Sequence, residues 1–156
     1  MNKQRIYLDT SVFGGFFDDE FQEFTEPLFD RINDGEFTII FSTLLEEELA
    51  LAPEKVRKLV QGINNVNTEF ITETDNAVEL ATEYVAEKVV GQTSYSDCLH
   101  IALATTNQAD LLVSWNFKHI VNIQRIRGYN SINIKNGYKP LEIRSPRDLM
   151  DYGNEN

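Results

Sequence analysis

Short apolar runs that end at a polar residue constrain the fold of this chain more than any other feature. Each run has the length of a strand, and a Ser or an Asp follows it at once or shortly after: 6–8 before Asp9, 37–41 before Ser42, 111–113 before Ser114 and 141–143 before Ser145. Continuous apolar strands are typical of a sheet covered on both faces. We therefore expect a buried sheet with polar side chains where its strands end.

Segments with a helical repeat lie between these runs. Apolar residues recur at helical spacing in 24–32, 56–63 and 78–89, and a further helix begins near Asp97. Alternating strands and helices require crossover connections, which favour an α/β fold with a mostly parallel sheet. Ligands bind beyond the carboxyl ends of the strands in such sheets, so the polar residues that follow the strands are the candidates for function.

The length of the chain fits one domain. With 156 residues, we expect a single domain over 1–150 and a short polar tail over 151–156. Cys98 is the only cysteine, so no internal disulfide can form, and the sequence shows neither an export signal nor a membrane span. These features favour a cytoplasmic protein.

The formal net charge of −11, taken alone, argues against a nucleic-acid partner. Its distribution weakens that argument, because residues 1–110 carry 7 Lys or Arg and 21 Asp or Glu, whereas residues 111–156 carry 7 and 4. The basic residues between Arg125 and Arg147 have two interpretations. They form either a solvated surface or a phosphate-binding track beside an acidic pocket.

Asp9 and Asp97 both lie at positions where a carboxylate can either cap a helix or turn or belong to a functional site. Asp9 follows the first strand, where it either caps the next turn or is a functional group at the sheet edge. Asp97 has capping-box spacing from Ser94, so it either belongs to a helix start or takes part in a site. His100, one turn later, is expected to be packed or hydrogen-bonded rather than a ligand.

Glu48 stands in the middle of the apolar face of an expected helix that runs to Ala52, whereas Glu46 and Glu47 point to solvent. A carboxylate on an apolar face is costly unless it is paired, protonated or bound to a cation. The position therefore predicts either a functional carboxylate or a buried salt bridge.

Asn116 lies just beyond the third clear strand and offers an amide that, with Ser114, orders a site or a water, or else makes a turn. Several carboxylates that converge at one sheet edge repel one another and raise their pKa values. Mg²⁺ or Mn²⁺ removes that conflict and supports phosphodiester hydrolysis. We therefore expect a metal site formed by Asp9, Glu48 and Asp97, with Asn116 beside it.

Four short stretches resemble the motifs of the PIN-domain family, in the same order and over residues 5 to about 147. The stretches are residues 7–11, 42–49, 97–102 and 112–116. The resemblance implies a three-layer α/β/α sandwich around a parallel sheet. It also implies a metal-dependent ribonuclease that leaves 5′-phosphate and 3′-hydroxyl ends, similar to the VapC-like toxins of type II toxin–antitoxin systems.

Carried onto this chain, the resemblance places the family's acidic ligands on Asp9, Glu48 and Asp97, and its fourth position, frequently Asp, on Asn116. Since Asn adds no negative charge, we expect one strongly held ion rather than two. The resemblance further implies a homodimer and an antitoxin protein whose basic or aromatic segment plugs the pocket. The acid-rich stretch 18–36 either receives that partner or is a solvated helix face.

Two other functions compete with a ribonuclease. A catalytically weak or inactive PIN-like module that binds RNA or protein is motivated by Asn116 and by the net charge. A phosphotransfer or receiver domain would suit an Asp after the first strand. That alternative is disfavoured, because Ser11 stands where a second Asp is needed and Lys118 follows no paired Asp.

Overall fold

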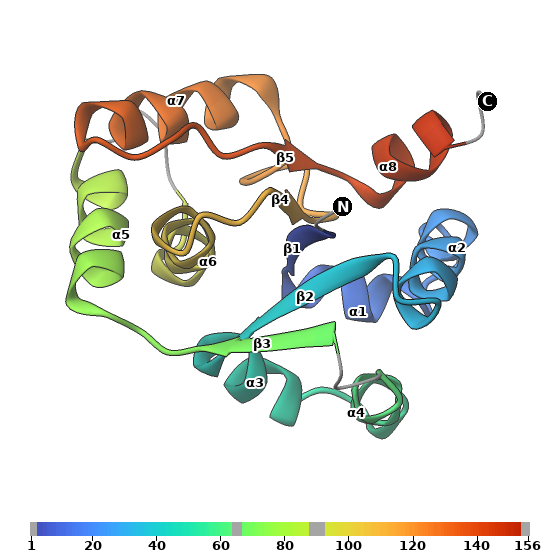
Figure 1. The fold of residues 1–156 in the computed structure, drawn as a ribbon. Helices are drawn as coiled ribbons and strands as arrows, with labels where there is room; N and C mark the ends of the chain where they lie inside the picture. The colour runs from blue at the N-terminus through green and yellow to red at the C-terminus, as the bar shows by residue number, and fades with distance from the viewer. Residues whose placement is uncertain (1–2, 64–66, 88–92, 154–156) are drawn as a thin grey trace.

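The computed structural model describes residues 3–63, 67–87 and 93–153, and a parallel five-stranded sheet in the order β3-β2-β1-β4-β5 forms its centre (Figure 1). The strands are β1 (Gln4–Leu8), β2 (Phe37–Ser42), β3 (Thr68–Ile71), β4 (Leu111–Val113) and β5 (Ile143–Arg144). The helices are α1 (Thr10–Gly15), α2 (Gln22–Asn33), α3 (Thr43–Ala50), α4 (Glu54–Gln61), α5 (Asp75–Glu87), α6 (Tyr95–Thr106), α7 (Ile123–Lys135) and α8 (Pro146–Gly153).

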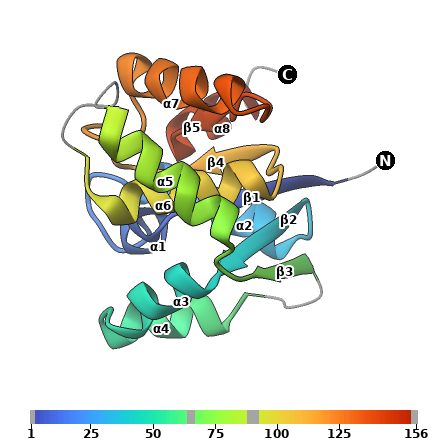
Figure 2. The ribbon, with the colours of Figure 1, turned by 90° about the vertical axis from the view of Figure 1, so that its left-hand side faces the viewer.

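Helices cover both faces of the sheet, which confirms the three-layer α/β/α fold. Successive side chains of a strand point to opposite faces, so Tyr7 packs with α5, α6 and α7, whereas Ile6 and Leu8 pack against the other helices. Figures 1 and 2 show α5, α6 and α7 on one side of the sheet and α1, α2, α3, α4 and α8 on the other. Because both faces are buried, the central strands are apolar throughout.

The carboxyl ends of β1, β2 and β4 lie at one edge of the sheet. In the parallel register, Ile6 of β1 is opposite Ile39 of β2 and Leu111 of β4. The pairing continues beyond the end of β1, where the Asp9 backbone N–H donates to the Val113 carbonyl at 3.1 Å. This register brings the polar residues that follow the three strands to the same edge.

Most elements follow the sequence expectation, and the differences have physical reasons. The helices expected at 24–32 and 56–63 are present, as is the one near Asp97, while the expected segment 78–89 extends beyond the described part of α5. The strand expected at 141–143 is wrong in its bounds, because β5 pairs with β4 only at residues 143 and 144. The helix through Glu48 ends at Ala50 rather than at Ala52, since Leu51 already donates to the Glu48 carbonyl as the C-cap.

Arg5 fastens the opposite, amino edge of the sheet. Its guanidinium forms a salt bridge with Glu69 of β3 at 2.8 Å and donates to the carbonyls of Asn107 and Gln108, which lie between α6 and β4. The Arg5 backbone N–H also donates to the Asp110 carboxylate at 2.8 Å. One side chain therefore connects the first strand to segments from two other parts of the chain.

Across the described residues, no helix has the length and hydrophobicity needed to span a membrane.

A close approach between α1 and Trp115 gives a test of this packing. A Cβ at Gly15 would lie 2.7 Å from the indole ring, which is held by stacking on Phe21, whereas a Cβ at Gly14 would meet nothing within 4 Å. We expect Gly15→Ala to lower the free energy of unfolding by about 1–3 kcal/mol. The matched control Gly14→Ala should be neutral or stabilising by up to about 1 kcal/mol. Urea unfolding measures both, and equal effects of the two substitutions would contradict the packing described.

Candidate active site

Asp9 is a buried carboxylate held between two serine hydroxyls. It is the N-cap of α1, where its Oδ1 accepts from the Ser11 backbone N–H at 3.1 Å and from the Ser11 hydroxyl at 2.5 Å. Ser114, which follows β4, donates to its Oδ2 at 2.6 Å. Only 4% of Asp9 is exposed. Asp9 thus fills the capping role considered from the sequence and also faces the carboxyl edge of the sheet.

Burial is the main influence on the pKa of Asp9 and raises it above the ordinary value of an Asp side chain. Hydrogen bonds from Ser11 and Ser114 and the nearby His100 oppose this rise, while the negative charge of Asp97 adds to it. An ionised Asp9 therefore costs folding free energy in the bare protein. A cation beside the carboxylate would offset that cost.

Glu48 projects from α3 toward a buried histidine. His100 Nε2 forms a short hydrogen bond with Glu48 Oε1, and His100 Nδ1 pairs with the Tyr7 hydroxyl at 2.6 Å. The Tyr7 hydroxyl in turn contacts Ser42 Oγ at 2.7 Å. His100 is packed and hydrogen-bonded, as expected. Glu48, whose side chain is 32% exposed, has the salt-bridge partner that the sequence analysis named as one alternative.

The pKa of Glu48 lies below its ordinary value. Burial by itself would raise the pKa, but the hydrogen bond and the charge of His100 together lower it. Glu48 is therefore an anion under neutral conditions, and its orientation is set by His100 on α6. This pair leaves the predicted role of Glu48 as a metal ligand untested.

Asp97 and Asn116 face each other at the same edge. Ser94, rather than Asp97, caps α6 through its side chain, which accepts from the Asp97 backbone N–H at 3.2 Å. The Asn116 amide Nδ2 lies 3.5 Å from Asp97 Oδ2, at the limit of a hydrogen bond. Asn116 Oδ1 accepts from the His119 backbone N–H at 2.9 Å, which fixes the amide with its nitrogen toward Asp97. Asn116 thus supplies a donor where an Asp would supply a charge.

Ser114 links the two carboxylates. Its hydroxyl donates to Asp9 and accepts from the Asn116 backbone N–H at 2.9 Å, and the Asn116 side chain then reaches Asp97. A continuous path of hydrogen bonds therefore runs from the end of β1 to the start of α6. The structure joins Asp9, Asp97 and Asn116 in this way, with Glu48 attached to His100 on the same helix as Asp97.

The sequence indicated Ser11 only as a hydroxyl that could orient Asp9, and it indicated no role for the Tyr7 hydroxyl. Ser11 Oγ donates to Asp9 and accepts from the Trp115 backbone N–H at 2.9 Å, so it braces two segments that are far apart in the chain. The signal for Ser11 was its place two residues after a strand-ending Asp, which is the geometry of an Asx-turn. Tyr7 had no comparable signal, because its partners Ser42 and His100 come from distant parts of the sequence.

The donor set fits a hard divalent cation in its chemistry. Carboxylate and hydroxyl oxygens surround the site, and oxygen ligands are what Mg²⁺ and Mn²⁺ prefer. In the residues that the structure describes, however, no three His, Cys, Asp or Glu side chains are grouped closely enough to hold a metal ion. An ion shared by Asp9, Glu48 and Asp97 would therefore require Glu48 to turn from His100 or to act through water.

The basic residues of the C-terminal part do not form one free track. Lys135 forms salt bridges with Glu83 and Glu87 on α5, and Arg144 pairs with Glu142 at 3.2 Å. Residues 125–147 therefore do not form a continuous phosphate-binding track, because Lys135 and Arg144 are already paired with carboxylates. A phosphate-binding surface could include only the basic residues nearest the site. There, Arg125 at the start of α7 donates to the Thr93 hydroxyl at 2.5 Å, close to the beginning of α6.

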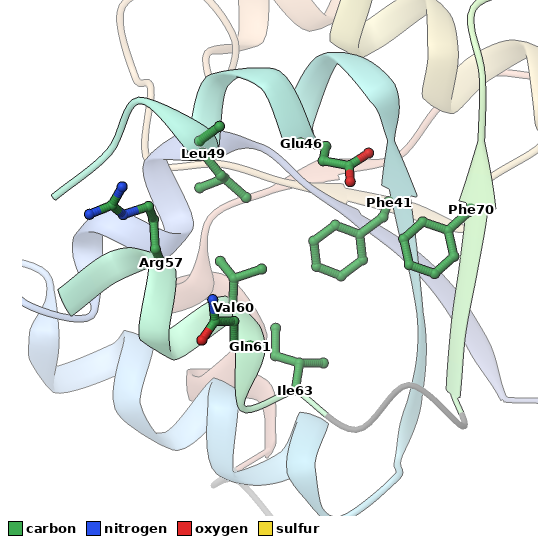
Figure 3. A pocket seen from close by; sticks show the side chains of 9 residues that line it. Phe41, Glu46, Leu49, Arg57, Val60, Gln61, Ile63 and Phe70 are labelled. Carbon is green, nitrogen blue, oxygen red and sulfur yellow. The ribbon is translucent and has the colours of Figure 1, made fainter. Parts of the chain in front are cut away.

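A separate, mainly apolar cavity of about 440 Å³ lies between α3, α4 and the edge of the sheet. Phe41 and Phe70 form one wall with stacked rings, and Leu49, Val60 and Ile63 complete the apolar lining (Figure 3). None of the four predicted site residues lines it. The cavity and the carboxylate cluster are therefore distinct features, although α3 and β2 contribute residues to both regions.

The fold and the site together define a class of protein: an α/β domain whose parallel sheet presents an acidic cluster at its carboxyl edge. The family model of the PIN domain matches residues 6–119, a range that contains all four predicted site residues. The chain belongs to the PIN domain family. A search of curated proteins found no match to the sequence.

Solved structures of low sequence identity share this fold. VapC20 from Mycobacterium tuberculosis, described as a sarcin-ricin loop cleaving toxin, is 12% identical with a TM-score of 0.57, over 73% of this chain and 92% of that one. VapBC2 from Rickettsia felis, bound to a promoter DNA fragment, is 15% identical with a TM-score of 0.56 over 91% and 98%. FitAcB from Neisseria gonorrhoeae is 12% identical with a TM-score of 0.59, and the match covers 91% of this chain and 98% of that one. These similarities establish the fold.

The raised pKa of Asp9 predicts a pH-dependent cost to the metal-free protein. A group whose folded pKa exceeds its unfolded value stabilises the fold below the unfolded pKa and loses that contribution as the pH rises through the folded pKa. In EDTA, we expect Asp9→Asn to gain stability relative to the wild type as the pH is raised from about 4 to about 7. Urea unfolding across this range measures the difference, with Asp30→Asn on the exposed face of α2 as control. A gain that shrinks with rising pH would contradict this assignment.

Proposed function

We propose that this protein is a divalent-metal-dependent ribonuclease that hydrolyses RNA phosphodiester bonds, and that it is the toxin of a toxin–antitoxin pair. One observation carries the proposal: in a PIN domain, a buried and energetically costly Asp9 carboxylate is connected through Ser114 and Asn116 to Asp97 at the carboxyl edge of the sheet. An expensive charge kept at a ligand-binding edge is characteristic of a functional site.

In this proposal Asp9 and Asp97 hold Mg²⁺ or Mn²⁺, with Glu48 as the third carboxylate, directly or through water. When bound, the ion supplies a polarised phosphoryl oxygen and a water of lowered pKa. Ser11 and Ser114 hold the Asp9 carboxylate in place, and His100 orients Glu48. Asn116 positions Asp97 and adds no negative charge, which supports one strongly bound ion rather than two.

The proposed partner is an antitoxin protein, supported by the VapBC2 and FitAcB complexes among the structures of similar fold. The outer face of α2 exposes Glu23, Glu26 and Asp30, which would suit a basic segment of such a partner. We also propose that the toxin is cytoplasmic, as its single cysteine favours, and that it is a homodimer, as the family resemblance implies.

A catalytically weak PIN-like module that binds RNA or protein is the second candidate. Two observations favour it: an amide stands at Asn116, and Glu48 is already paired with His100. Such a module would retain the fold and a surface for its partner without cutting RNA. The two candidates therefore differ in activity rather than in architecture.

Cleavage of RNA decides between these two candidates. We expect the wild type to cut end-labelled mixed RNA with Mg²⁺ or Mn²⁺ and not with EDTA, and Asp97→Asn to lower the rate by about 100-fold or more. Glu48→Gln should also lose activity, whereas Glu47→Gln, an exposed neighbour on the same helix, should keep it. Folding of each variant is checked by circular dichroism. Full metal-dependent activity in Asp97→Asn would show that the assignment is wrong, and a folded wild type that does not cut RNA would favour the binding module.

Metal binding can be tested without activity. If Asp9 and Asp97 hold the ion, Mg²⁺ at about 100 times its dissociation constant should stabilise the wild type by about 2.7 kcal/mol. For a domain of this size that corresponds to a rise in Tm of roughly 5–10 °C. The rise should disappear in Asp97→Asn and persist in Glu47→Gln, with NaCl at equal ionic strength as the control. An equal rise in both variants would place the bound ion elsewhere.

A further inference from the structure

Phe117 is a large aromatic side chain that remains exposed beside the candidate active site. It follows Asn116 directly in the chain, and 48% of it is accessible to solvent. The Asn116 amide lies 3.5 Å from Asp97, so the backbone that carries the Phe117 ring is one residue beyond the carboxylate cluster. An exposed phenylalanine adds little to folding, because most of its apolar surface stays in water.

The backbone of Phe117 is nevertheless held firmly. Its N–H donates to the Trp115 carbonyl at 3.0 Å, and its own carbonyl accepts from the Asn122 side chain at 3.0 Å. The same Asn122 amide donates to the Lys118 carbonyl at 2.9 Å. The segment that presents the ring is therefore fixed by hydrogen bonds on both sides, although the ring itself faces solvent.

A buried aromatic stack supports the ring from below. Trp115 is 6% exposed, stacks on Phe21 with ring centroids 4.3 Å apart, and donates its indole N–H to Thr25 at 2.8 Å. Phe117 meets Trp115 edge to face at 5.9 Å and Phe21 at 6.5 Å. Phe117 thus packs on a rigid aromatic base, and the exposed part of its ring is available to a planar ligand.

The charge beside the ring suits a phosphate backbone. Lys118 is exposed, and across the described residues no carboxylate lies within salt-bridge distance of it. An exposed aromatic residue followed in the chain by an exposed lysine suits single-stranded nucleic acid, since a base can stack on the ring and the ammonium group can neutralise a phosphate. Double-stranded RNA offers no unstacked base to such a ring.

We propose that Phe117 is a stacking platform for an unpaired base of the RNA substrate, next to the bond that is cut, and that Lys118 contacts the adjoining phosphate. This inference rests on the proposed ribonuclease function and adds to it a residue that positions the substrate. Phe117 is a positioning residue: it sets which nucleotide lies at the carboxylates and takes no part in bond breaking.

The test measures binding separately from cleavage. Fluorescence anisotropy with an unstructured single-stranded RNA is carried out on the full chain carrying Asp97→Asn, so that the RNA stays intact. Adding Phe117→Ala should weaken binding roughly 5- to 100-fold, and Phe117→Trp should retain it. The control Phe70→Ala removes a ring that is 70% exposed on β3 and should leave binding unchanged. Phe117→Leu keeps the apolar volume without the ring, so its loss of affinity separates stacking from a folding defect.

An RNA with an abasic site at each position in turn sharpens the test. At one position, removal of the base should weaken binding to the protein that retains Phe117. The same abasic RNA should bind the Phe117→Ala protein almost as well as intact RNA does, because that protein has no ring on which the base could stack. Equal binding by the Phe117 and Phe117→Ala proteins would overturn the proposal. So would a change of oligomeric state or loss of antitoxin binding in Phe117→Ala without an effect on RNA, which would make the ring a protein contact. Metal-dependent cutting with an unchanged KM in Phe117→Ala would overturn this inference alone, whereas a wild type that neither binds nor cuts RNA would overturn the ribonuclease proposal as well.

Discussion

The burial of one carboxylate, Asp9, is the constraint on which the rest of the site depends. It stands at the end of the central strand, where it can be accommodated only because Ser11 and Ser114 donate to both of its oxygens. These hydrogen bonds also tie the ends of β1 and β4 together, since Ser11 accepts from Trp115. The same contacts therefore shape the sheet edge and hold a charge that costs free energy, so the stability of the fold and the geometry of the proposed site are coupled there.

The sequence was informative where one local pattern determines the structure. The apolar runs of β1, β2 and β4 and the polar residues after them correctly indicated a parallel sheet with polar side chains at the carboxyl edge. The sequence analysis did not predict α1, β3, α7 or α8, and β3 and α7 were missed because tertiary contacts create them. The edge strand β3 reads Thr-Glu-Phe-Ile and is only partly buried, and α7 contains Gly128 and several β-branched residues that weaken its helical propensity. Packing of Tyr129 against Tyr84 and the Tyr84–Asn133 hydrogen bond hold α7 in place.

Positions in the candidate site were predictable, but their partners were not. Parallel topology alone requires that Asp9 and Asn116 reach the same edge, and the apolar helix face singled out Glu48. That Glu48 meets His100, and that His100 meets the Tyr7 hydroxyl, depends on how α3 and α6 pack across the sheet. No spacing in the chain encodes such an arrangement. The packing that brings the polar side chains together also determines which of them are already hydrogen-bonded to one another.

The hydrogen bond between Asp9 and Ser114 joins residues 105 positions apart in the chain. It has a consequence for synthesis, because a ribosome releases the first of these residues long before the second. Until β4 has emerged and paired with β1, Asp9 lacks one of its two hydroxyl donors, and Asp97 lacks its link through Asn116. Long-range strand pairing of this kind is slow compared with local helix formation. A nascent chain therefore carries no assembled site until Asn116 has left the ribosome, so any activity of the site begins only after β4 has paired with β1.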